Sequence, residues 1–96
     1  MQSAIAFAYF CAGRYDQSAA WAEKAVKEQP TFAAALRVLA ASSASLGRTK
    51  EATEALVRLK ETKATVHISE LRHFPFREPK YFAKYAEALR KAGFPE

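Results

Sequence analysis

Residues 13–30 read Gly-Arg-Tyr-Asp-Gln-Ser-Ala-Ala-Trp-Ala-Glu-Lys-Ala-Val-Lys-Glu-Gln-Pro. Gly13 favours the end of one helix, and Pro30 marks where the next helix must stop. The Gly-Arg pair recurs 34 residues later, at Gly47-Arg48. Shifting the sequence by this period aligns further pairs of residues: Ile5 with Leu39, Ala6 with Ala40, Ala12 with Leu46, and Ala22 with Leu56. The spacing therefore predicts a pair of helices that occurs twice, as in a helical solenoid.

Apolar residues at three- and four-residue spacing predict the individual helices. The expected ranges are 2–12, 15–28, 32–46, 49–60, a short helix over 65–72, and a last helix from 79 that closes at Gly93. Thr31 is a candidate cap for the third of these. The last helix is amphipathic, with an apolar face of Phe82, Tyr85, Ala86, Leu89 and Ala92. We expect it to seal the final helix pair from water.

The first expected helix is apolar nearly all round, because Ile5, Phe7, Tyr9 and Phe10 point in different directions. A helix without a polar face is normally buried on more than one side. In this sequence no helix precedes it that could cover its outer face. The pattern is typical of the C-terminal end of a longer solenoid, or of a chain whose first helix is covered by a partner.

The stretch from Gly13 to Pro30 resembles the second half of a tetratricopeptide repeat. The matching features are the turn glycine, Tyr15 two residues later, the small residues Ser18 and Ala25, and the closing proline. The second unit departs from the pattern at Thr49, Leu59 and Ala64, and the first at Gln2 and Ala6. The resemblance implies an all-α, right-handed α-α superhelix in one domain, 1–96. Its parts would be repeats over about 1–32 and 33–64, followed by linking and capping helices over 65–96.

The C-terminal residues 62–96 resemble the endings of class III adenylate/guanylate cyclase-like proteins of bacteria. Three segments carry this resemblance: 68–72 (Ile-Ser-Glu-Leu-Arg), 75–79 (Pro-Phe-Arg-Glu-Pro) and 88–96 (Ala-Leu-Arg-Lys-Ala-Gly-Phe-Pro-Glu). It implies a regulatory or oligomerisation region that lies C-terminal to a catalytic domain in a signalling protein. A tetratricopeptide adaptor unrelated to cyclases is the alternative.

In tetratricopeptide folds the first helix of each unit lines a concave groove that binds peptides. Transferred to this sequence, the groove would consist of Phe7, Phe10, Cys11, Arg37, Val38, Ala41, Ala44 and Ser45. Such a surface is apolar, so we expect a protein or peptide partner, a neighbouring domain, or a second copy joined through the first helix. The Lys and Asn residues that hold a carboxylate in chaperone-binding members are missing. Alternatively, Phe7 and Phe10 contact a preceding repeat.

The remaining features favour no reaction, cofactor or metal. The chain has a net charge of +5, but acidic residues interrupt the basic ones, so a nucleic-acid-binding accessory domain is only the alternative function. His67 and His73 have no third ligand nearby, and the serines have no His–Asp partner. Cys11 is the only cysteine, and no stretch approaches the ~20 apolar residues of a membrane span. We expect a non-catalytic, cytoplasmic protein.

Overall fold

The computed structural model describes residues 2–30, 32–62, 68 and 79–95, and this part of the chain contains five α-helices and no strand. The helices are α1 (Gln2–Cys11), α2 (Tyr15–Glu28), α3 (Ala33–Ser45), α4 (Thr49–Glu61) and α5 (Pro79–Ala92). The all-α prediction is confirmed, and each of these helices begins and ends within one residue of its predicted range. The helix expected over 65–72 and the cap expected at Thr31 lie outside the described residues.

The predicted helix ends at Gly13 and Gly47 have the same backbone geometry. Their φ angles are 81° and 79°, in the left-handed region that glycine adopts without a steric penalty. Gly13 N–H donates to the carbonyl of Phe10 and Arg14 N–H to that of Tyr9. Gly47 and Arg48 repeat this pattern with Ala44 and Ser43. These bonds satisfy the last carbonyls of α1 and α3 and turn the chain back along each helix.

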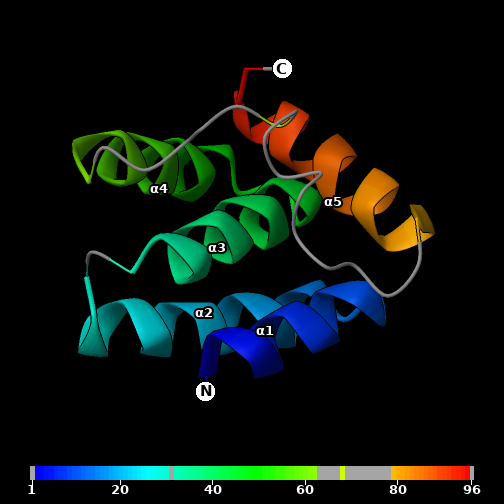
Figure 1. Ribbon diagram of the computed structural model, residues 1–96, viewed down its shortest axis with the longest axis horizontal. Coiled ribbons are helices and arrows are strands. Elements are labelled where there is room, and N and C mark those ends of the chain that lie inside the picture. The colour runs from blue at the N-terminus through cyan, green and yellow to red at the C-terminus, as the bar shows by residue number, and fades with distance from the viewer. Residues whose placement is uncertain (1, 31, 63–67, 69–78, 96) are drawn as a thin grey trace.

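Two helical hairpins follow one another, and each helix packs on its neighbours in sequence. Contacts join α1 with α2, α2 with α3, and α3 with α4, and α1 also touches α3. In Figure 1 the hairpins lie in successive layers, with α3 between the α1–α2 pair and α4. Small side chains allow this close approach, and the buried Ser18 hydroxyl donates to the Ala6 carbonyl at 2.7 Å. In the second hairpin the residues 34 positions later are Ala52 and Ala40, both buried.

The last helix, α5, lies beside α3 and α4 and reaches α1 (Figure 1). Its buried residues include the predicted Tyr85, Ala86, Leu89 and Ala92, together with Ala88. Phe94, which follows the helix, is also buried. Its N–H donates to the Leu89 carbonyl at 3.0 Å, and the Ile68 N–H donates to the Pro95 carbonyl at 2.9 Å. These two hydrogen bonds fix the residues that follow α5, one to the last turn of the helix and the other to Ile68.

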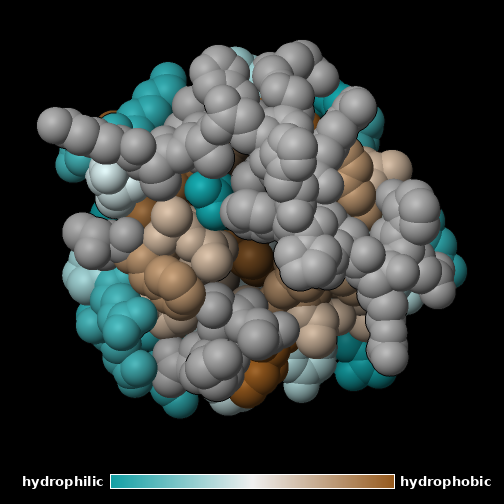
Figure 2. Space-filling model, viewed as in Figure 1, coloured by the Kyte–Doolittle hydropathy of each residue, from teal (hydrophilic) through white to brown (hydrophobic). Residues whose placement is uncertain are grey.

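One hydrophobic core joins all five helices, and the molecule measures 29 × 25 × 25 Å. On the face shown in Figure 2, hydrophobic residues gather over the middle and hydrophilic ones lie along the rim. Three large hydrophobic residues of the described part remain well exposed: Ile5, Phe32 and Val57. They lie on three different helices or helix ends, so each has to be considered separately as a contact surface.

Candidate interaction surfaces

The residues predicted to line a groove lie on α1 and α3, but most of them are buried. Phe10, Arg37, Val38 and Ala41 are each at most 6% exposed, and Phe7, Cys11, Ala44 and Ser45 are half-buried. Two helices contact both α1 and α3, namely α2 and α5. The sequence interpretation left this surface open, or covered by a partner or a preceding repeat. In the structure, the chain's own last helix packs against it.

Tyr85 of α5 makes aromatic contacts with two residues of α1. Its ring centroid lies 5.2 Å from that of Phe7 and 5.6 Å from that of Phe10, at interplanar angles of 81° and 72°. These edge-to-face contacts place the positive ring edge of one residue against the negative face of another. The ring centroid of Phe10 also lies 5.3 Å from that of Tyr15. Tyr85 therefore completes an aromatic cluster that is shared between α1, the start of α2, and α5.

Lys84, next to Tyr85, brings a positive charge to the C-terminal end of α1. Its Nζ lies 3.5 Å from the Cys11 carbonyl oxygen and 5.3 Å from the centroid of the Tyr15 ring. The end of a helix carries a partial negative charge, and α1 has no basic residue in its own last turn. Lys84 supplies this cation from another helix. Its ammonium is also stabilised by the electron-rich aromatic face.

Burial shifts the pKa values of three side chains where α5 packs on α1 and α3, namely Tyr85, Arg37 and Cys11. Burial raises the pKa of the Tyr85 phenol far above its ordinary value, while the nearby Arg37 charge opposes this shift. Burial likewise lowers the pKa of Arg37, with Tyr85 acting in the opposite direction. The pKa of Cys11 is raised by burial and lowered less strongly by Lys84. A thiol with a raised pKa is a weaker nucleophile at neutral pH.

A separate hollow of about 280 Å³ lies at the C-terminal ends of α2 and α4, lined by Pro30, Arg58, Glu61 and Thr62. Its lining has one acidic side chain, Glu61, and one basic side chain, Arg58. The four lining residues include no Ser or Cys nucleophile beside a His base, the kind of pair used in covalent catalysis. Within the described residues no group of three His, Cys, Asp or Glu side chains comes together as a metal site would require. His67 and His73 lie outside that part of the chain.

None of the five described helices has the length and apolar character needed to cross a bilayer. A scan of protein-family models, a search of curated proteins and a search of solved structures each found no match to the chain.

Sequence reasoning identified Tyr85 as a core residue but missed its position against Phe7 and Phe10. Lys84 was not among the residues of the last helix that we predicted to face the core, yet the structure places its ammonium at the end of α1. The available signal was the adjacency of Lys84 to Tyr85 at the edge of the apolar face. That signal shows which residues can reach inward but does not name the helix they contact.

Proposed function

We propose that this protein is a non-catalytic interaction module whose α1–α3 surface binds an amphipathic helix. The observation that supports this best is the docking of α5 on that surface through Tyr85 and Lys84. In the folded chain α5 acts as an internal ligand. A partner helix would bind by replacing it.

The chemistry of the surface defines the helix that it accepts. Phe7 and Phe10 provide ring faces and edges, so an aromatic side chain is favoured opposite them. The Cys11 carbonyl and the Tyr15 ring favour a cation on the neighbouring position. A Lys-Tyr or Arg-Tyr pair followed by small and aliphatic residues would meet both requirements. This is helix-in-groove recognition, in which a few anchors on one helical face give most of the affinity.

The proposal includes a place for the module in a larger protein. The likeness of residues 13–30 to a tetratricopeptide repeat supports an interaction role. The likeness of residues 62–96 to cyclase-like endings supports a regulatory or oligomerisation region in a cytoplasmic nucleotide cyclase-like signalling protein. The covering of α1 and α3 by α5 gives such a region a closed form. A helix from a neighbouring domain would then compete with α5 for the same contacts.

A labelled peptide of residues 79–95 tests the receptor surface directly. In the unchanged chain α5 competes at the millimolar effective concentration typical of tethered segments, so the added peptide should bind weakly. Tyr85→Ala in the full chain weakens the internal helix, and we expect it to bind the added peptide at least tenfold more tightly. Fluorescence anisotropy gives both affinities.

Two further measurements keep the test decisive. The milder Lys84→Ala chain leaves the buried aromatic residues intact and should show a smaller gain in affinity. A control peptide with Ala at position 85 should bind poorly to every chain, because it lacks the aromatic anchor. Equal binding of the two peptides, or no gain in either variant chain, would show that α5 is a fixed part of the core and that the proposed receptor surface does not exist.

A further inference from the structure

Arg37 places a positive charge in the interface where α5 packs on α3. It is 6% exposed, and of the charged residues in the described part of the chain it alone is buried. Tyr85 of α5 is 4% exposed, and its phenol and the Arg37 guanidinium each act on the pKa of the other, so the two groups lie within range of each other's charge. A buried charge is costly unless an opposite charge lies beside it. Arg37 therefore gives this interface a preference for anions.

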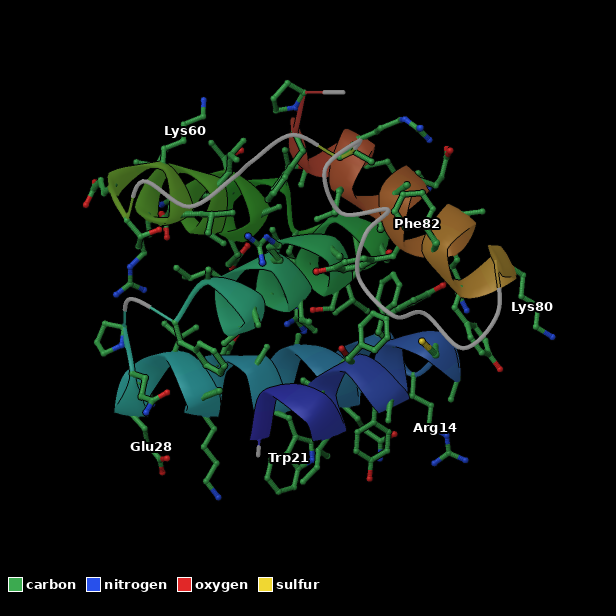
Figure 3. The ribbon with its side chains drawn as sticks, in the orientation of Figure 1. Arg14, Trp21, Glu28, Lys60, Lys80 and Phe82 are labelled. Carbon is green, nitrogen blue, oxygen red and sulfur yellow. The ribbon has the colours of Figure 1, made fainter. Side chains whose placement is uncertain are left out.

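The helix α5 brings no anion to the inner side of the interface. Its single acidic residue, Glu87, is exposed, and the Glu87 carboxylate lies 3.8 Å from Arg90 Nη1. In Figure 3 the side chain of Lys80, near the start of α5, likewise extends away from the other helices. The group of α5 that interacts with Arg37 is the Tyr85 phenol, which is neutral at neutral pH because burial raises its pKa. A helix with an acidic residue on its inner face would offer Arg37 a charge that α5 does not.

The direction of α5 indicates where such an acidic residue would lie. Lys84 meets the end of α1 at the Cys11 carbonyl, whereas a Cβ on Gly93 would lie 3.5 Å from Leu56 Cδ2 of α4. The helix therefore runs from α1 toward α4 while it packs on α3 (Figure 1). Ala88 follows Tyr85 by about one turn in this direction, on the same face, and is 3% exposed. A carboxylate at this position would lie on the inner face, next to the phenol with which Arg37 interacts.

We propose that Arg37 selects partner helices that carry an acidic residue one turn after their aromatic anchor, at the position that Ala88 occupies in α5. This preference rests on the proposed function, because it concerns the helix that replaces α5. A carboxylate forms a charge-assisted hydrogen bond with a guanidinium, and such a bond is stronger than one between a guanidinium and a neutral phenol. A partner with this residue has an advantage over α5, which has only alanine there.

Peptides of residues 79–95 that differ only at position 88 test this preference. The receptor is the Tyr85→Ala full chain, in which the internal helix is weakened. We expect the Ala88→Asp peptide to bind about tenfold more tightly than the Ala88→Asn peptide, which has nearly the same shape without the charge. Fluorescence anisotropy gives the affinities, and circular dichroism checks that each receptor chain is folded.

Two controls separate this contact from the general attraction between an acidic peptide and a chain of charge +5. An Ala83→Asp peptide carries the same added charge on the exposed face of the helix. It should gain no more than about twofold in affinity, and added salt should remove that gain. Arg37→Met in the receptor removes the buried charge but keeps a long side chain. In that receptor the Ala88→Asp peptide should bind no better than the Ala88→Asn peptide, since its carboxylate would be buried without a cation.

The outcomes distinguish this preference from the proposed function. If none of the peptides binds the Tyr85→Ala chain, the receptor surface does not exist and both proposals fail. If the Ala88→Asp and Ala88→Asn peptides bind with equal affinity, the surface accepts helices but does not select an acidic residue. If the advantage of Ala88→Asp survives Arg37→Met in the receptor, Arg37 is not the residue that selects it.

Discussion

Replacing Tyr85 with alanine removes an aromatic ring through which α5 packs against α1. Tyr85 is 4% exposed and its ring contacts two other rings, those of Phe7 and Phe10. Truncating a buried aromatic residue to alanine lowers the free energy of unfolding by about 3–5 kcal/mol, through lost transfer energy and the cavity left behind. The edge-to-face contacts supply about 0.5–1.5 kcal/mol of interaction beyond the buried area.

The expected loss is large in relation to the whole molecule. At about 0.05–0.15 kcal/mol per residue, a chain of 96 residues has a free energy of unfolding of about 5–14 kcal/mol. Tyr85→Ala therefore removes about a fifth or more of the stability. Urea unfolding followed by circular dichroism measures this loss as a shift of the midpoint with little change in slope, provided that the whole chain unfolds as one unit.

Tyr81→Ala is the matched control, because it makes the same truncation one turn earlier on the same helix. Tyr81 is half-buried and lies beside Lys80, whose Nζ is 5.4 Å from its ring centroid. We expect this variant to lose about 1 kcal/mol or less, as most exposed or half-exposed positions do. If Tyr81→Ala and Tyr85→Ala lose the same free energy, or if Tyr85→Ala loses less than about 1.5 kcal/mol, Tyr85 does not anchor α5 as described.

Three further variants test other contacts. Burial raises the pKa of Tyr85 above its ordinary 10.0, so the folded chain holds a proton that the unfolded chain releases. The part of the free energy of unfolding that is linked to this proton is thus complete below pH 10. Above pH 10 it falls by up to about 1.4 kcal/mol per pH unit. In alkaline urea titrations Tyr85→Phe should lose less stability than the unchanged chain, and parallel curves would contradict this. Gly47→Ala has open space around the added Cβ but a φ of 79°. Backbone strain alone should therefore lower stability by about 1–2 kcal/mol in thermal unfolding. Ser18→Ala removes the buried bond to the Ala6 carbonyl. We expect a loss of about 0.5–1.5 kcal/mol in urea unfolding, and no loss would show that the bond contributes nothing net.

The helices could be predicted from the sequence because their ends depend on local chemistry. Gly13 and Gly47 adopt the left-handed conformation that ends a helix, and this preference belongs to glycine in any surrounding fold. The three- and four-residue spacing of Ala22, Ala25 and Val26 likewise identifies the buried face of α2 before any partner is known.

The covering of the candidate groove could not be predicted in the same way. The spacing of Tyr85 and Leu89 shows which face of α5 is buried, but an amphipathic pattern carries no information about which helices complete the core. The predicted partner was the last helix pair, α3 and α4, and α5 does contact both of these helices, but it also reaches α1. The position of α5 is set by contacts between residues far apart in the sequence, mostly with α3 and also with α1, as between Lys84 and Cys11. Periodicity within a single helix cannot reveal such contacts.

The composition of α1 follows from the two surfaces it presents. A helix at the edge of a molecule normally keeps one polar face for solvent, yet α1 has no charged residue on any side. Its inner side needs Phe7 and Phe10 because α5 and the start of α2 pack against them. Those contacts do not explain Ile5, which points away from them and stays 40% exposed. Burial within one copy therefore accounts for one half of this helix, while the half that carries Ile5 keeps its apolar character at the surface. A partner that displaces α5 would uncover the first half and remove Lys84 from the end of the same helix.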